Sequence, residues 1–118
     1  MGYRSNVLIV YHGPKEVVKA FIVAAKFNGH GKAITEMTTK DCPDGFAIGT
    51  LFKSVKWYMD YLDVKMHEDL WYFAQEFENL SGSFCRTGED DDDTEMKSFG
   101  EASDPINVHR VIDCDYDF

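Results

Sequence analysis

Runs of hydrophobic residues predict the main strands of this chain. Residues 4–11 form a nearly continuous β-branched and apolar run, which is typical of a buried strand. A second strand is expected over 46–58, and its alternation slips near Thr50, which predicts a bulge or a bend at that point. Two further strands are expected over 83–87 and 106–114.

Apolar residues at helical spacing predict two helices. Residues 14–27 carry two neighbouring apolar stripes, Pro14 suits the first helical position, and Asn28-Gly29 favours a helix end. Residues 64–80 form the clearer helix, and Asp63 is expected to be its N-cap. The apolar positions of this second helix recur at intervals of four and three: Met66, Leu70, Phe73, Phe77 and Leu80.

The order of these elements predicts one α+β domain. Between the first helix and the second strand, residues 32–39 fit an irregular strand or a loop. We expect a two-layer sandwich in which about four mostly antiparallel strands carry two helices on one face. A ferredoxin-like arrangement is the nearest named fold. Residues 88–95 are expected to form an acidic loop, and 97–103 are only weakly patterned.

Composition narrows the class of protein. Hydrophobic residues make up 44% and aromatic residues 14% of the 118 positions, which is enough for a core and excludes a disordered chain. Three cysteines without a C-x-x-C pair exclude a disulfide scaffold, so free thiols are expected. No apolar run approaches the roughly 18 residues of a membrane span. The start lacks a signal-peptide pattern, and Asn6 stands where myristoylation needs Ser or Thr, so we expect a cytoplasmic protein.

The negative charge is confined to the last quarter of the sequence. Acidic and basic residues balance over 1–87, and the whole net charge of −9 therefore comes from 88–118. The densest part is the acidic turn, Glu89–Glu95, in which only Thr94 is not acidic. Phosphate groups repel such a surface, so direct binding to nucleic acid or to an anionic membrane is not expected. The acidic residues of this turn are Glu89, Asp90, Asp91, Asp92, Asp93 and Glu95.

Short motifs follow one another along most of the chain: Tyr3-Arg4-Ser5-Asn6-Val7, Lys56-Trp57-Tyr58, Arg86-x-Gly88-Glu89-Asp90 and Arg110-Val111-Ile112. In this order they resemble a group of small, uncharacterised phage and prophage proteins. The chain departs from that group at Cys85, where similar proteins carry an aromatic residue or Ile. The resemblance implies a virus-encoded protein made in a bacterial cytoplasm, with no catalytic residue to transfer. Small phage proteins of this size are often non-catalytic binders of host proteins.

The acidic turn admits three interpretations. As a calcium loop beginning at Asp90, it places oxygen ligands at suitable positions, but Glu95 replaces the required Gly. The ligands would be Asp90, Asp92, Thr94, Ser98 and Glu101. A solvated, self-repelling loop is favoured over that site. The third interpretation is a surface that mimics phosphate spacing and occupies a partner's basic groove.

Other candidate chemistry is weaker. Glu95-x-Lys97 with upstream aspartates is similar to a metal-dependent nuclease pattern, but the segment is too polar for a core strand. His12, His30, His67 and His109 show no zinc spacing, and His67 is expected on the flank of its helix.

A cluster of aromatic residues near the end of the second strand is the other candidate surface. Trp57, Tyr58 and Tyr61 are expected to anchor an interface. In the alternative, Trp57 and Leu62 pin the second helix to the sheet and the tyrosines lie half buried. Arg4 and Arg86 are expected to pair with the acidic turn and tie it down.

Together these features favour a non-enzymatic protein that binds, and thereby inhibits, a host protein. The expected partner is a nucleic-acid-binding or defence protein, contacted by the acidic turn and by the aromatic cluster. We expect no catalytic residue, metal or cofactor. The alternatives are a metal-binding module or metal-dependent enzyme that uses 89–101, and a structural virion component. The oligomeric state does not follow from the sequence.

Overall fold

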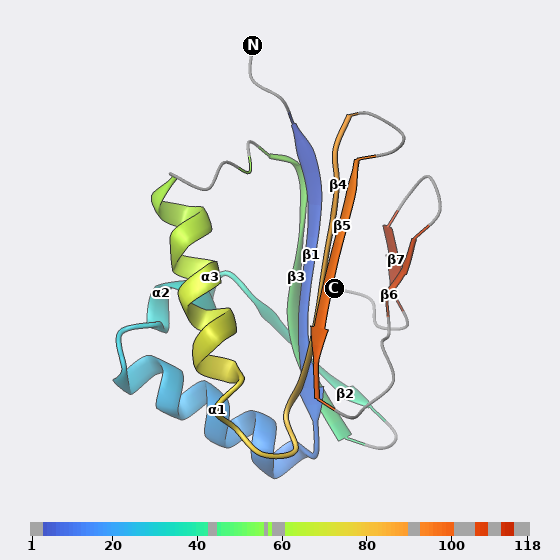
Figure 1. The fold of residues 1–118 in the computed structure, drawn as a ribbon. Helices are drawn as coiled ribbons and strands as arrows, with labels where there is room; N and C mark the ends of the chain where they lie inside the picture. Colours follow the sequence, from blue (N-terminus) through green and yellow to red (C-terminus); the bar gives the residue numbers. More distant parts are fainter. Residues whose placement is uncertain are drawn as a thin grey trace.

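A five-stranded antiparallel sheet forms the centre of the fold, in the strand order β2-β3-β1-β4-β5 (Figure 1). The computed structural model describes residues 4–42, 45–55, 57, 61–89, 93–100, 106–108 and 112–114. The strands of the sheet are β1 (Ser5–Gly13), β2 (Thr38–Cys42), β3 (Gly45–Val55), β4 (Ser81–Thr87) and β5 (Thr94–Phe99). The helices are α1 (Lys15–Phe27), α2 (Gly31–Thr35) and α3 (Leu62–Ala74), and a separate strand pair follows, β6 (Ile106–Val108) and β7 (Ile112–Cys114).

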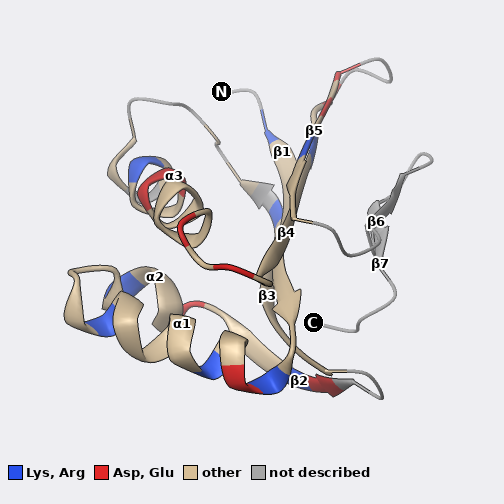
Figure 2. Cartoon of the chain, turned by 60° about the horizontal axis from the view of Figure 1, so that its bottom comes forward, with Lys and Arg blue, Asp and Glu red and all other residues tan. Residues whose placement is uncertain are grey.

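The helical connections join strands that are not neighbours in the sheet. The chain passes from β1 through α1 and α2 to β2, and β3 lies between these two strands. It passes from β3 through α3 to β4, and β1 lies between them. Two interleaved split βαβ units of this kind are the ferredoxin-like arrangement. The helices lie on one face of the sheet (Figure 2). The expected α+β architecture is confirmed, with five strands instead of four and with α2 as an additional helix.

The central strand β1 is buried on both faces, as its continuous apolar run predicts. Val7, Ile9 and Tyr11 point to the helical side, and Leu8 and Val10 point to the other side. The ring centroid of Tyr11 lies 5.1 Å from that of Phe21 on α1 and 5.9 Å from that of Trp71 on α3. The core therefore joins the middle of the sheet to both long helices. Its buried members on the helices are Val18, Phe21, Ala25, Ala33, Ile34, Val64, Leu70, Trp71 and Ala74.

The two edge strands differ from their predictions. The segment 32–39, expected as an irregular strand or loop, contains α2 and the start of β2. Residues 94–99, expected partly as acidic loop and partly as unpatterned chain, form β5. Both strands are polar because each pairs on one side only, and charged side chains suit the edge of a sheet. β2 is the strand that completes the first split βαβ unit.

The prediction of one strand over 106–114 is wrong. β6 and β7 pair only with each other, antiparallel, and are not part of the central sheet. They lie against β4 on the face opposite the helices (Figure 1). The described residues therefore form a third, small layer that the two-layer expectation lacked.

Several element boundaries differ from their predictions. α1 and its end at Asn28 are confirmed, and the Asn28 side chain donates a 2.7 Å hydrogen bond to the carbonyl of Ala24. Pro14, however, is the N-cap of α1 and not its first residue. α3 begins after Tyr61, so Asp63 lies inside the helix and is not the N-cap.

The remaining differences concern the end of α3 and the bulge. α3 ends at Ala74, and the last apolar positions of its stripe, Phe77 and Leu80, lie in the following turn and still pack in the core. The strand irregularity lies between Phe52 and Val55 rather than near Thr50. Among the described residues, no helix is long and apolar enough to cross a membrane.

Candidate functional site

The fold brings the aromatic cluster and the acidic turn to one end of the sheet. Ser5 at the start of β1 pairs with Val55 at the end of β3, and its neighbour Asn6 pairs with Thr87 at the end of β4. Thr87 in turn pairs with Thr94, the first residue of β5. The segments after β3 and between β4 and β5 therefore leave the sheet at the same end (Figure 1). Tyr58 and Asp90–Asp92 lie outside the described residues.

Arg86 fixes the second half of the acidic turn. Its Nη2 and Nη1 atoms donate hydrogen bonds of 2.8 and 3.1 Å to the two carboxylate oxygens of Asp93. Its Nε donates a longer bond of 3.4 Å to Glu95, and Nη1 also donates to the hydroxyl of Ser5 at 3.2 Å. The hydrogen bond to Asp93 raises the pKa of Arg86 above its usual range. The expected tie between Arg86 and the turn is confirmed.

Main-chain N–H groups also bond two residues of the turn, Glu89 and Asp93. The backbone N–H of Arg4 donates a 3.1 Å hydrogen bond to the carboxylate of Glu89. The backbone N–H of Gly88 donates a 2.8 Å bond to the carbonyl of Asp93 and closes the turn. Figure 2 shows acidic residues at the end of the β4–β5 hairpin. The described acidic residues are thus preorganised on this hairpin.

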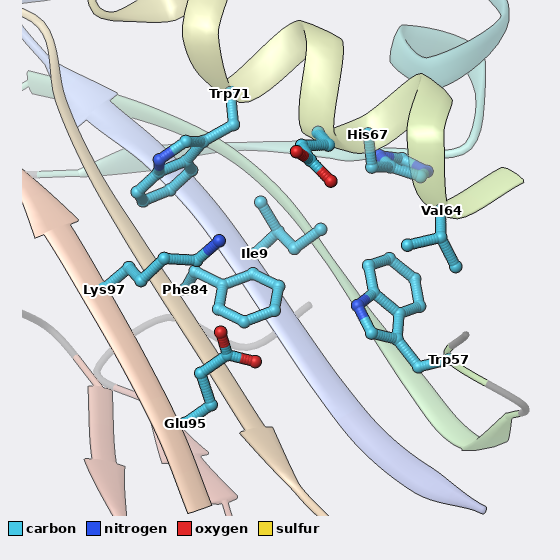
Figure 3. A pocket seen from close by; sticks show the side chains of 9 residues that line it. Ile9, Trp57, Val64, His67, Trp71, Phe84, Glu95 and Lys97 are labelled. Carbon is cyan, nitrogen blue, oxygen red and sulfur yellow. The ribbon is translucent and has the colours of Figure 1, made fainter. Parts of the chain in front are cut away.

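A pocket lies between α3 and the β4–β5 side of the sheet and connects the two predicted surfaces (Figure 3). It holds about 420 Å³ of empty space, part of which is open to solvent. Trp57 of the aromatic cluster forms one wall, and Glu95 of the acidic turn lies at the opposite side. The other lining residues are Ile9, Val64, His67, Glu68, Trp71, Phe84 and Lys97.

Helical and strand periodicities explain why these side chains meet. One face of α3 carries the lining residues of the helix, because they follow one another at intervals of three or four residues. These residues are Val64, then His67 and Glu68, and then Trp71. On the sheet, Phe84 pairs with Ile9 on one side and with Lys97 on the other. These positions point to the helical side, together with Glu95, which precedes Lys97 by two residues on β5.

Three aromatic rings form the apolar walls of the pocket. The ring of Phe84 lies 6.2 Å from that of Trp57 and 6.2 Å from that of Trp71, between the two indoles. Trp57 also lies 6.3 Å from the imidazole of His67. Trp57 therefore takes part in both expected roles, because it packs against the core while lining a pocket. Tyr61 is 43% exposed at the start of α3.

Lys97 occupies the aromatic part of the pocket. Its Nζ lies 4.7 Å from the ring centroid of Phe84 and 5.9 Å from that of Trp71, which are cation–π distances. Lys97 forms no ion pair with any carboxylate of the described residues. Figure 3 shows its side chain reaching from β5 across Phe84. The pocket therefore already accommodates a positive group.

The expectation that His67 lies on the flank of its helix is wrong, because its side chain is buried. It is 2% exposed, and its ring packs edge-on against Phe52 at 5.4 Å. Its Nε2 lies 3.3 Å from a carboxylate oxygen of Glu36, the residue that follows α2. His67 thus forms the inner wall of the pocket and links α3 to the α2 region.

The calcium-loop interpretation is wrong for the described part of its ligand set. Thr94 and Ser98 both lie on the extended strand β5, so their positions are about 13 Å apart. One cation cannot contact both, because calcium–oxygen distances are only about 2.3–2.6 Å. Asp90, Asp92 and Glu101 lie outside the described residues. Within the described ranges, no group of three His, Cys, Asp or Glu side chains is placed to hold a metal ion.

Sequence reasoning missed most of the pocket. The polar segment around Glu95-x-Lys97 argues against a core strand, whereas in the structure the pair lies on the edge strand β5 with both side chains on one face. On a strand, residues two positions apart lie on the same face, so a prediction of β5 would have placed Glu95 and Lys97 together. Cys85 is fully buried as a free thiol, as expected.

Comparisons of the chain with protein-family models, with curated proteins and with solved structures gave no match.

Proposed function

We propose that this protein is a non-enzymatic binding module that recognises a basic surface of a partner protein. The observation that carries the proposal is the hydrogen bonding of Arg86 to Asp93 and Glu95, which holds the acidic hairpin at the same sheet end as Trp57 and Tyr61. A preorganised charged surface loses less conformational entropy on binding than a mobile one.

The distribution of charge supports a basic partner. The whole net charge of −9 arises after residue 87, and a concentrated field of one sign accelerates encounter with a surface of the opposite sign. Arg86 neutralises part of the negative charge of Asp93 and Glu95. We therefore assign the long-range attraction chiefly to the other acidic residues of the turn, Glu89, Asp90, Asp91 and Asp92. Tyr61 and Leu62 at the start of α3, which are 43% and 76% exposed, supply apolar area at the same end of the sheet.

The partner we propose is a bacterial host protein. The resemblance to small phage proteins favours a viral origin and a site of action in the host cytoplasm. A basic groove of a nucleic-acid-binding or defence protein is the surface that the acidic residues would cover. Covering that groove would block its access to phosphate groups and would inhibit the host protein.

Capture from a nuclease-treated bacterial lysate at low and high salt, read by mass spectrometry, tests this function. The informative variant is D90N/D91N/D92N, because it leaves the residues bonded to Arg86 unchanged. Its matched control is E16Q/E76Q/E78Q, which removes the same charge from exposed positions on α1 and after α3. We expect one host protein to be retained by the wild type and the control at low salt, and lost at high salt and with the turn variant.

Two results would contradict the proposal. Equal capture by the turn variant and the wild type would remove the electrostatic mechanism. Recovery of no specific protein at either salt concentration would remove the host-binding function and favour a structural virion component.

A further inference from the structure

We propose that the pocket between α3 and the β4–β5 hairpin binds the guanidinium group of an arginine side chain on the partner. In the unbound chain, the ammonium group of Lys97 occupies the same place. The inference rests on the proposed function, since it names the chemistry by which the same sheet end selects a basic partner. It concerns a different set of residues from the acidic turn, and the two are tested separately.

The present occupant of the pocket shows which charge it favours. The Nζ of Lys97 lies 4.7 Å from the Phe84 ring and 5.9 Å from the Trp71 ring. Aromatic faces carry negative potential and attract cations, most strongly where the side chain is indole. Two indoles and one phenyl ring line this pocket, so its apolar part suits a cation with a flat shape.

Two carboxylates complete the pocket. Glu68 lines it from α3, and Glu95 lines it from β5. Lys97 is the only cationic side chain among the lining residues, and no described carboxylate forms an ion pair with it. Glu95 already shares its charge with Arg86 at 3.4 Å, whereas Glu68 forms no ion pair with a described residue. Glu68 is therefore the main carboxylate available to an incoming cation, and an anionic ligand would be repelled.

A guanidinium group fits this arrangement better than a second ammonium group. It is planar and weakly hydrated, it stacks on aromatic rings, and it donates several hydrogen bonds in one plane. A stacked arginine would reach both rings and carboxylates, since charge-assisted bonds to carboxylates form in that plane. An ammonium group is compact and strongly hydrated and gains less from flat aromatic walls.

Displacement of Lys97 requires only a side-chain movement. Lys97 is exposed and lies on β5, the edge strand, whose backbone pairs with β4 alone. Its four-carbon side chain can rotate into solvent without breaking any backbone hydrogen bond of the sheet. The exchange of one cation for another keeps the charge of the pocket balanced.

Tryptophan signals report on this pocket selectively, because the chain has two tryptophans and both line it. The experiment titrates the full chain with N-acetyl-arginine amide and follows the two indole N–H resonances by NMR. N-acetyl-lysine amide and N-acetyl-citrulline amide serve as controls, since citrulline keeps the shape of arginine without its charge. We expect saturable shifts of both indole signals with the arginine probe, weaker binding of lysine and no binding of citrulline.

Substitutions separate the pocket from general charge effects. K97A removes the internal competitor and is expected to tighten arginine binding about two- to fivefold. Lys53, an exposed lysine on β3 outside the pocket, gives the matched control K53A, which is expected to change nothing. E68Q is expected to weaken binding by a similar factor, whereas E78Q, at an exposed position after α3, is expected to leave it unchanged. K97M keeps the aliphatic stem and replaces K97A if the smaller side chain prevents folding.

Defined results overturn the inference. The first is the absence of saturable indole shifts with the arginine probe in both the wild type and the lysine variants. The second is equal binding of arginine and citrulline probes, and the third is unchanged or weaker arginine binding in K97A. If the probe fails while D90N/D91N/D92N still abolishes partner capture, the pocket inference falls and the proposed function stands. If the probe binds and no partner is captured, the preference of the pocket for a guanidinium group stands and the proposed function falls.

Discussion

The ring of Phe99 lies over Gly82, its pairing partner on the neighbouring strand. A Cβ atom at position 82 would overlap that ring, so only glycine leaves room for it. From this position Phe99 packs edge-on against Trp71 at a centroid distance of 5.0 Å. The missing side chain on β4 therefore positions an aromatic residue of the edge strand, which in turn supports the indole that lines the pocket.

G82A is expected to destabilise the protein by about 1–3 kcal/mol, because Phe99 must leave its site or the strands must separate. The measurement is chemical denaturation of G82A, F99A and the double variant. In the F99A background the extra methyl group meets no ring, so G82A should then cost much less. Equal costs in both backgrounds would show that the ring does not depend on Gly82.

Replacement of Arg86 is expected to loosen the acidic turn. R86M leaves Asp93 and Glu95 without their shared cation and is expected to lower the free energy of unfolding by about 1 kcal/mol, since these groups are only partly buried. R86K keeps the charge but loses the parallel hydrogen bonds to Asp93, so an intermediate loss is expected. Thermal melts at low and high salt measure both effects. A melting temperature of R86M equal to that of the wild type would contradict the structural role of Arg86.

The hydroxyl of Tyr11 predicts an alkaline limit of stability. Burial raises the pKa of Tyr11 above its usual value of about 10, because charge is disfavoured in the core. Above about pH 10 the unfolded chain releases this proton while the folded chain retains it. Ionisation therefore lowers the free energy of the unfolded state only. The free energy of unfolding, which has its full value below that pH, falls as the pH rises.

Y11F tests that account directly. No described residue forms a hydrogen bond with the Tyr11 hydroxyl, so its removal is expected to be neutral or slightly stabilising at pH 7. The variant should also lose less stability than the wild type between pH 9 and pH 11. Denaturation curves across this range provide the comparison, and Y72F, at a tyrosine that is 61% exposed, is the control. Identical pH slopes for Y11F and the wild type would refute the assignment to Tyr11.

The parts of the fold that the sequence predicts are those with a buried face. β1, α1 and α3 each place apolar residues at a fixed period against the core, as Val7, Phe21 and Leu70 do. The edge strands give no such signal, since β2 and β5 pair on one side only and carry charged residues. The pairing of Arg86 with the acidic turn follows from opposite charge alone and could be predicted. The position of Lys97 depends on β5, so it could not be predicted without that strand.

The pocket was beyond sequence reasoning for a related reason. Its walls come from Ile9, Trp57, Trp71, Phe84 and Lys97, which lie on five separate segments. Only the strand order places β4 and β5 beside α3, and that order follows from long-range pairing rather than from any local pattern. The acidic and aromatic candidates were recognised as separate surfaces, and their meeting at one sheet end required the structure.

The central claim is that the acidic turn attracts and holds a basic partner. Its most direct test measures the dissociation constant of the captured host protein over a range of salt concentrations for the wild type, D90N/D91N/D92N and E16Q/E76Q/E78Q. We predict that the turn variant binds at least tenfold more weakly, by about 1.4 kcal/mol or more, and with a flatter salt dependence, whereas the control keeps the affinity and slope of the wild type. Equal affinities and slopes for the two charge-matched variants would contradict the account.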